Sequence, residues 1–201
     1  EKPFGKNIKE SKCMNLIAKK YSIKIFVNFI RESNPGYVKL RKFLLKNNKD
    51  FTNIIIQYNN SFQNNTSHWF IFFHNIYGKL NKIYDLNLGK KNFTKNILLN
   101  FDNANINFIQ SSEVKKNNFF LNINSKNYCI SINSNEEITI FYKTNKKINQ
   151  LKIETNMYRY QYYVYENLVN YFYNNKYNLI TSIAIMDRLK TMYKVIRKYN
   201  D

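Results

Sequence analysis

The stretch "IKIFVNFIRESNPGYVKLRKFLLKN", residues 23–47, decides the fold that the sequence predicts. Its first seven residues are mostly apolar with polar residues interspersed, which indicates a strand over 23–29 that is buried on both faces. An Asn-Pro-Gly break at 34–36 follows, and proline suits the first turn of a helix. The helix predicted over 37–47 is basic and amphipathic. The stretch therefore predicts the first half of a β-α-β unit.

The loop between this strand and helix is a common place for chemistry in α/β folds. Residues 31–37 contain one glycine and no cysteine, so they predict neither a phosphate cradle nor a redox pair. No other stretch resembles a nucleophile elbow. The sequence predicts no enzyme, no cofactor and no small-molecule substrate. We expect the helix N-terminus, with Arg31, to hold an anion such as a backbone phosphate.

Further elements are expected on both sides of this stretch. A strand that follows the helix completes a β-α-β unit with parallel strands. A β-hairpin and a short helix come next, giving a β-β-α order. The expected elements are strands over 53–58, 68–75 and 81–88 and a helix over 94–101.

The rest of the chain predicts a second layer. Residues 117–144 favour two or three short antiparallel strands, and two helices are expected over 157–177 and 178–199. We divide the chain into a basic N-terminal extension (1–22), an α/β domain (23–108) and an α+β extension (109–201).

An aromatic stripe runs along the helix predicted over 157–177. Its members are spaced by four and three residues, which favours a buried face over base stacking. The stripe comprises Tyr158, Tyr162, Tyr165, Val169 and Phe172. The tyrosines off the stripe are free to touch RNA or a partner: Tyr160, Tyr163, Tyr171 and Tyr173.

The charge balance points to an anionic partner. The chain has 32 Lys+Arg against 13 Asp+Glu, a net charge of +19. Asn, Lys, Ile, Tyr and Phe are abundant and have A/T-rich codons, so part of this bias reflects genome composition. Nucleic acid is the leading candidate partner and an acidic membrane surface the second. No apolar run is long enough to span a bilayer.

Basic residues on the faces of two predicted helices are the candidate RNA contacts. Many weak lysine contacts to phosphates favour sequence-blind binding. Together with the loop arginine, the candidates are Arg31, Lys39, Arg41, Lys42, Lys46, Arg188, Lys190, Lys194, Arg197 and Lys198.

A metal site is not expected. Cys13 and Cys129 are isolated, which fits a reducing compartment. His68 and His74 lie six apart, on one face of the predicted strand, without carboxylate or thiolate partners nearby. The acidic pair Glu136–Glu137 is expected in a solvated turn.

Three segments resemble the thioredoxin-like domain family shared by two mitochondrial ribosomal proteins and an accessory subunit of respiratory complex I. They are "VKLRKFL" (38–44), "SHWFIFFHNIYGK" (67–79) and "KIYDLNL" (82–88), which ends in Asn87-Leu88. The spacing from His68 to Gly78 also agrees. The resemblance covers 23–101 and implies a thioredoxin-like β-α-β/β-β-α core, without redox activity, followed by a C-terminal α+β extension.

This resemblance implies a structural protein of a mitochondrial ribosome, with the large-subunit member favoured. The expected partners are ribosomal RNA and neighbouring mitoribosomal proteins, and the expected location is the mitochondrial matrix or another organelle with its own ribosome. Two alternatives remain open. One is an accessory subunit of a mitochondrial respiratory complex, and the other is a small nucleic-acid-processing nuclease.

Overall fold

The structure is a computed structural model of the 201-residue chain. It describes residues 4–47, 50–58, 62–86, 96–110, 119–144, 147–174 and 178–200, without the side chains of 62–66, 174, 180 and 196–200. The helices are α1 (Ile8–Lys20), α2 (Ile30–Ser33), α3 (Pro35–Lys46), α4 (Phe62–Tyr77), the 3-10 turn η1 (Met157–Arg159), α5 (Tyr160–Asn174) and α6 (Ser182–Asn200).

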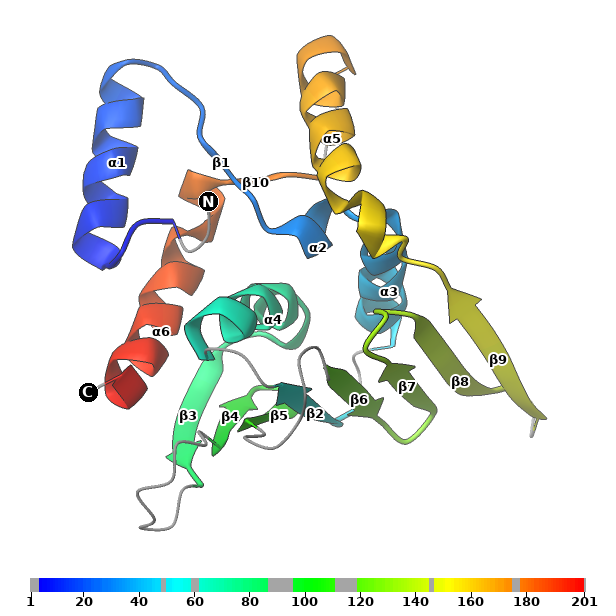
Figure 1. The fold of residues 1–201 in the computed structure, drawn as a ribbon. Helices are drawn as coiled ribbons and strands as arrows, with labels where there is room; N and C mark the ends of the chain where they lie inside the picture. Colours follow the sequence, from blue (N-terminus) through cyan, green and yellow to red (C-terminus); the bar gives the residue numbers. More distant parts are fainter. Residues whose placement is uncertain are drawn as a thin grey trace.

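Most strands belong to one mixed sheet. Its spatial order is β3-β4-β5-β2-β6-β7-β8-β9, and every neighbouring pair is antiparallel except β2 with β5. The described helices lie on one side of this sheet (Figure 1). The strands are β2 (Thr52–Tyr58), β3 (Leu80–Asp85), β4 (Asn96–Phe101), β5 (Ala104–Gln110), β6 (Phe120–Asn124), β7 (Tyr128–Ile132), β8 (Ile138–Thr144) and β9 (Lys147–Ile153).

The sheet buries one face and leaves the other uncovered by any described helix. In β2, Ile54 and Ile56 are 1% exposed, whereas Ile55 between them is 40% exposed. Successive side chains of a strand point to opposite faces, so this alternation separates an inner face from an outer face. The hydrophobic core lies between the inner face and the helices.

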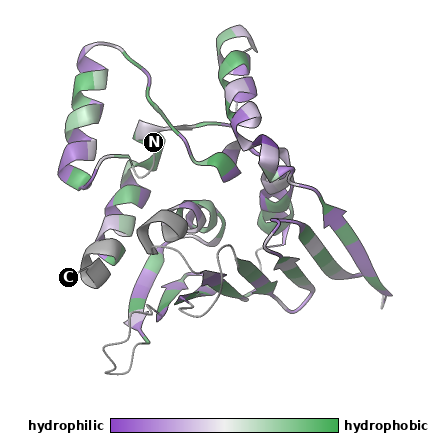
Figure 2. Cartoon of the chain, viewed as in Figure 1, coloured by the Kyte–Doolittle hydropathy of each residue, from purple (hydrophilic) through white to green (hydrophobic). Residues whose placement is uncertain are grey.

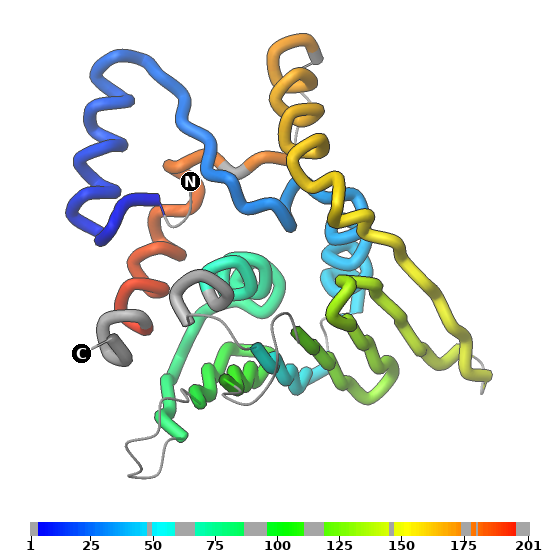
Figure 3. The backbone as a smooth tube through the Cα atoms, in the orientation of Figure 1, coloured from blue at the N-terminus to red at the C-terminus, as the bar shows by residue number. Residues whose placement is uncertain are grey.

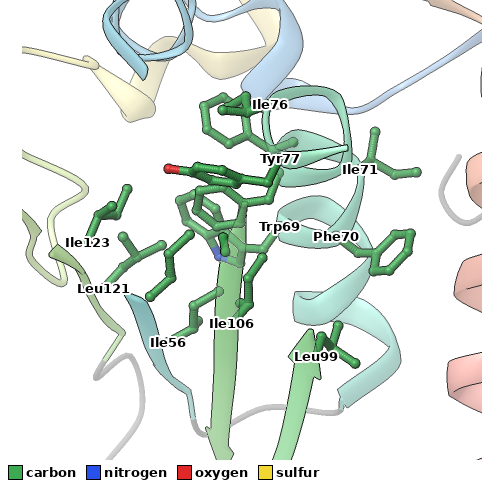
Figure 4. Packing of buried hydrophobic residues seen from close by; sticks show 14 of the residues in the cluster. Ile56, Trp69, Phe70, Ile71, Ile76, Tyr77, Leu99, Ile106, Leu121 and Ile123 are labelled. Atoms are coloured by element: carbon green, nitrogen blue, oxygen red, sulfur yellow. The ribbon is translucent and has the colours of Figure 1, made fainter. Parts of the chain in front are cut away.

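The helix α4 is the centre of that core, and the strand predicted over 68–75 is wrong. Residues from Trp69 to Phe73 are each at most 1% exposed. Trp69 and Tyr77 point from α4 toward Ile56 and Ile106 of the sheet (Figure 4). A helix buried on all sides shows no polar stripe, so its sequence is a continuous apolar run that a buried strand shows equally well.

The thioredoxin-like core is wrong for two further reasons. The stretch predicted as a central strand over 23–29 contributes only β1 (Phe26–Val27), which pairs with β10 (Ile180–Thr181) in a separate two-stranded sheet. The expected β-α-β crossover is therefore not formed with β2. The helix predicted over 94–101 is the strand β4, in which Ile97, Leu99 and Phe101 alternate inward.

Other predictions agree with the structure. The helix over 37–47 is α3, the strand over 53–58 is β2, and the strand over 81–88 overlaps β3. The two C-terminal helices are α5 and α6. The antiparallel strands expected in 117–144 are present, and β9 extends them; all belong to the same sheet as β2. The division of the chain at residue 108 stays a prediction.

The aromatic stripe on α5 is exposed, so the prediction that it is buried is wrong. Tyr158 is 78% exposed, Phe172 76% and Tyr165 63%. The spacing identified a common helical face correctly, but this face is exposed. The helix α5 projects away from the sheet (Figure 1).

The first and last helices lie side by side (Figure 3). The hydroxyl of Tyr193 on α6 donates to the carbonyl of Phe4, 3.2 Å away, just before α1. The Ser182 hydroxyl at the start of α6 bonds the side chain of Asn15 on α1. These contacts join the two ends of the described chain.

The Asn-Pro-Gly junction begins α3 and docks it on the chain that follows β9. The Asn34 Oδ1 atom accepts from the amides of Gly36 (2.9 Å) and Tyr37 (3.2 Å), which caps the helix. The Asn34 Nδ2 group donates to the carbonyl of Thr155 at 2.6 Å. A Cβ atom on Gly36 would lie 2.6 Å from the carbonyl oxygen of Glu154, so only glycine permits this close approach.

We expect Trp69→Ala to lower the free energy of unfolding by about 3–5 kcal/mol, because it leaves a cavity where the indole is 1% exposed. Urea unfolding followed by circular dichroism measures the change. Tyr158→Ala is the control, since that side chain is 78% exposed and its loss should cost less than about 0.5 kcal/mol. Equal effects of the two substitutions would contradict the central position of α4.

Candidate functional site

Arg31 lies on the helix α2 and is buried, whereas a residue that binds RNA must be exposed. Its side chain is 9% exposed, and its Nη2 atom lies 2.5 Å from Oε1 of Glu136 in the turn before β8. The guanidinium also lies over the indole of Trp69, with 4.3 Å from its central carbon to the ring centroid. This geometry combines an ion pair with a cation–π contact.

Tyr37 completes this buried group, which we call the Arg31 anchor (Arg31, Tyr37, Trp69 and Glu136). The Tyr37 hydroxyl donates to the second carboxylate oxygen of Glu136. Burial would lower the pKa of Arg31, but the charges and hydrogen bonds of Glu136 and Tyr37 together outweigh it and the pKa is raised. Burial, and then the Glu136 charge, raise the pKa of Tyr37 well above its ordinary value. The Arg31 anchor therefore consists of one ion pair and a neutral phenol.

A second group of charges, the charged cluster, lies where α2, α3, α4 and α6 meet. It consists of Glu32, Arg41, His74 and Arg188. Arg41 forms an ion pair with Glu32, whose side chain is 4% exposed. Burial raises the pKa of Glu32, while the charges of Arg41 and Arg188 act in the opposite direction.

The charged cluster carries more positive than negative charge. Burial lowers the pKa of Arg188, and the Glu32 carboxylate opposes this shift. Burial and then the Arg188 charge lower the pKa of His74, which favours its neutral form. Two guanidinium groups around one carboxylate leave a surplus cation at this junction.

A cleft of about 600 Å³ opens at the start of α3, between β9, η1 and α5. Its volume lies within the range of small-molecule sites, roughly 300–1,000 Å³. Cationic, acidic and phenolic groups line it together, from Lys39, Lys152, Glu154 and Tyr163. The arrangement suits an anionic ligand that also carries hydrogen-bonding groups.

The structure distributes the predicted RNA contacts over several places. Arg41 and Arg188 meet around Glu32, while Lys39 lines the cleft. Lys190 pairs with Asp187 at 2.7 Å on the exposed side of α6. Lys42, Lys46 and Lys194 are exposed, and the side chains of Arg197 and Lys198 lie outside the described residues. RNA binding by these lysines is a prediction that no observation tests.

Protein groups already occupy the position at the start of α3 where an anion was predicted to bind. The side chain of Asn34 caps the first turn, and residues 154 and 155 lie against Gly36. Glu136, expected in a solvated turn, is instead the partner of Arg31. The sequence contains a signal for these buried ion pairs. Only five of the 32 basic residues are arginines, and three of them lie in the Arg31 anchor and the charged cluster. Arginine suits buried ion pairs and ring stacking better than lysine does.

His68 and His74 lie on α4, so six residues separate them around a helix and place them on different faces. His68 is 6% exposed and packs edge-on against Phe29, with ring centroids 5.7 Å apart. Within the described ranges, no group of three or more His, Cys, Asp or Glu residues could hold a metal ion. None of the described helices is long and apolar enough to cross a membrane.

The fold is similar to that of solved oxidoreductases and dehydrogenases. No protein-family model matches the sequence, and no curated protein matches it. Solved structures do match. UDP-N-acetylglucosamine 3-dehydrogenase from Acidithiobacillus ferrooxidans has a TM-score of 0.73 at 12% identity, over 98% of this chain and 68% of its own.

Two further structures show the same likeness. A dehydrogenase from Clostridium difficile has a TM-score of 0.69 at 14% identity, over 98% of this chain and 69% of its own. An oxidoreductase from Agrobacterium radiobacter, solved with NAD⁺, L-tartaric acid and magnesium, has a TM-score of 0.67 at 11% identity. That match covers 94% of this chain and 66% of the other, so the chain spans about two thirds of the proteins it matches.

These comparisons correct the ribosomal interpretation. The chain shares its fold with oxidoreductases and dehydrogenases, and not with thioredoxin-like mitoribosomal proteins. The comparisons do not support a structural role in a ribosome, an accessory subunit of a respiratory complex or a nuclease. The prediction that the protein is not an enzyme is contradicted, because the matching structures are named as oxidoreductases and dehydrogenases. The mitochondrial location is untested and stays a prediction.

We expect Glu136→Gln to lower the free energy of unfolding by about 3 kcal/mol, because it leaves the buried Arg31 charge without its carboxylate. The double variant Arg31→Met/Glu136→Gln should recover most of this loss, since it removes both charges. Urea unfolding of the single and double variants gives the coupling energy. Lys190→Ala, which breaks an exposed pair, is the control and should change stability by less than about 0.5 kcal/mol.

The lowered pKa of His74 predicts a pH dependence of stability. A histidine whose pKa is lower in the folded than in the unfolded state gives its full contribution above the unfolded value of 6.5, and this contribution is lost as the pH falls below it. Urea unfolding between about pH 5 and pH 8 should therefore show a loss on acidification that is smaller in His74→Gln. Identical pH profiles of the two proteins would contradict the assignment.

Proposed function

We propose that this chain forms the substrate-binding part of a nicotinamide-dependent oxidoreductase that acts on a hydroxyl group of an anionic substrate. The observation that carries the proposal is the likeness of nearly the whole chain, 98%, to a sugar-nucleotide dehydrogenase and to other dehydrogenases. In such enzymes the protein binds and orients the substrate, and the nicotinamide cofactor accepts or supplies the hydride.

The cofactor would be held by a unit that this sequence does not contain. The four glycines, at positions 5, 36, 78 and 89, form no Gly-x-Gly-x-x-Gly motif, which is the usual pyrophosphate cradle. The chain also spans only about two thirds of the oxidoreductases that it matches. Both facts support a dinucleotide-binding unit in the remaining third.

Exposed apolar side chains lie on the side of the helices away from the sheet. They support the proposal that the dinucleotide-binding unit packs there. Leu16 on α1 is 69% exposed, and Ile183 at the start of α6 is 74% exposed. An apolar groove of about 420 Å³ lies between these helices. On α5, Tyr165 and Phe172 are exposed as well. Figure 2 shows hydrophobic residues among the hydrophilic ones along α1 and α5, the two helices that project from the body.

The cleft at the start of α3 supports an anionic substrate. Lys39 and Lys152 line it together with Tyr163, so an acidic group and hydroxyls would both find donors. Two of the matching structures are named for anionic molecules, a UDP-sugar and L-tartaric acid. The surplus charge of the chain, +19, would draw such substrates from solution.

The first test is dinucleotide binding. Isothermal titration of the natural full-length protein with NAD⁺ and NADP⁺ should show binding of one of them, and the absorbance of the reduced cofactor should rise with a nucleotide sugar or a hydroxy acid. The 201-residue chain by itself should bind neither dinucleotide, because it contains no glycine-rich cradle. A full-length protein that binds no dinucleotide would overturn the proposal.

The second test is the substrate cleft. Lys39→Ala and Lys152→Ala should each raise KM about tenfold, because each removes a charge-assisted hydrogen bond, while the dinucleotide Kd stays unchanged. Lys126→Ala is the matched control, since Lys126 is exposed in the turn between β6 and β7, outside the cleft. Unchanged KM in both cleft variants would exclude this cleft as the substrate site.

A further inference from the structure

The cleft at the start of α3 contains an acidic group together with two cations. Lys39 lines it from α3, while Lys152 and Glu154 line it from β9 and the chain that follows β9. All three residues are exposed, and none of them forms an ion pair within the part of the chain that the structure describes. The cleft therefore offers three unpaired charges, two positive and one negative, to a ligand.

Hydrogen bonds fix the wall of the cleft that carries Glu154. The next residue, Thr155, is 3% exposed, and its hydroxyl donates to the carbonyl of Glu136 at 2.9 Å. The carbonyl of Thr155 accepts from the side chain of Asn34 at 2.6 Å. On the same wall, the carbonyl oxygen of Glu154 lies so close to Gly36 that a Cβ atom there would be 2.6 Å away. The backbone of this wall is therefore held in place before a ligand arrives, which reduces the entropy that binding costs.

Lys152 and Glu154 lie on the same side of this wall. Burial alternates with exposure along the chain here, since Ile153 is 7% exposed and Thr155 is 3% exposed, whereas Lys152 and Glu154 are exposed. Successive side chains of an extended chain point to opposite sides, so the two charged residues point the same way, with their Cα atoms roughly 6.8 Å apart. A single small ligand can contact both of them.

The Glu154 carboxylate is unfavourable for a ligand that carries negative charge alone, because like charges repel. Acidic residues are also scarce in this chain, 13 against 32 basic ones, yet one of them lines the cleft. A ligand that brings an ammonium group to Glu154 replaces this repulsion with a charge-assisted hydrogen bond. The charges of the cleft therefore match a ligand that has both an ammonium group and an anionic group.

The remaining groups of the cleft suit a phosphorylated sugar. Two lysines match a phosphate, whose charge at neutral pH is about −1.5 to −2. The phenol of Tyr163 and the carboxamide of Asn156 also line the cleft and can hydrogen-bond to hydroxyl groups.

We propose that the cleft selects a phosphorylated amino sugar. Lys39 and Lys152 contact the phosphate, and Glu154 contacts the ammonium group and is the residue that determines this specificity. The assignment rests on the proposed function, which requires an anionic substrate with a hydroxyl group, and it names the class of that substrate.

Two hexose phosphates that differ at one carbon atom test this assignment. Glucosamine 6-phosphate carries an ammonium group where glucose 6-phosphate carries a hydroxyl. Isothermal titration of the natural full-length protein without dinucleotide, at about pH 6.5 where the amine is protonated, measures both affinities. The amino sugar should bind about tenfold more tightly, because it gains one charge-assisted hydrogen bond. Equal affinities, or no binding of glucosamine 6-phosphate, would overturn the assignment.

Substitutions separate the two charged contacts. Glu154→Gln should weaken binding of glucosamine 6-phosphate about tenfold without weakening that of glucose 6-phosphate, so the preference disappears. Lys39→Ala should weaken both sugars by the same factor, because both carry the phosphate. Asp187→Asn removes an exposed carboxylate on α6, outside the cleft, and as the matched control it should keep the preference. A preference that persists in Glu154→Gln would place the ammonium group elsewhere and overturn the assignment.

The outcome is distinguishable from failure of the proposed function. A protein that prefers glucosamine 6-phosphate but binds no dinucleotide would overturn the proposed function and retain the ligand assignment. A protein that reduces NAD⁺ or NADP⁺ with a hydroxylated substrate but shows no preference between the two sugars would overturn the ligand assignment and retain the proposed function.

Discussion

The buried charge of Arg31 is the constraint on which the helix layer depends. A guanidinium with 9% of its side chain exposed must be neutralised, and its carboxylate, Glu136, lies 105 residues further along the chain. Meeting that requirement fixes α2 against the turn before β8. The aromatic rings of Trp69 and Tyr37 complete the surroundings of the charge, which ties α4 and α3 to the same point.

Polar and apolar residues are divided among three surfaces with different roles. The inner face of the sheet and α4 are apolar and form the core. The helices carry much of the positive charge, with lysines at the cleft and arginines in the charged cluster. The outer face of the sheet carries asparagines, which are polar enough to face water without adding charge.

Local patterns predicted some elements and failed at others for physical reasons. α3 was predictable because Asn34 and Pro35 are a helix-start signal and its lysines face water. α4 was not, because a helix surrounded by core shows the same unbroken apolar run as a buried strand. β4 has the alternation of a strand in Ile97, Leu99 and Phe101, but its short length allowed a helical interpretation. The exposed stripe on α5 shows that spacing identifies a helical face without indicating what covers it.

The sequence by itself determined the charge, the start of α3, the amphipathic α6 and the absence of a glycine-rich dinucleotide cradle, because these depend on residues close together in the chain. Only the tertiary structure decided that β2 lies between β5 and β6, that Arg31 pairs with Glu136 and that Lys39 lines the same cleft as Glu154. These contacts join residues many positions apart, and local sequence patterns do not predict which strands become neighbours. The oxidoreductase fold depends on that arrangement of strands, which is why it became evident only in three dimensions.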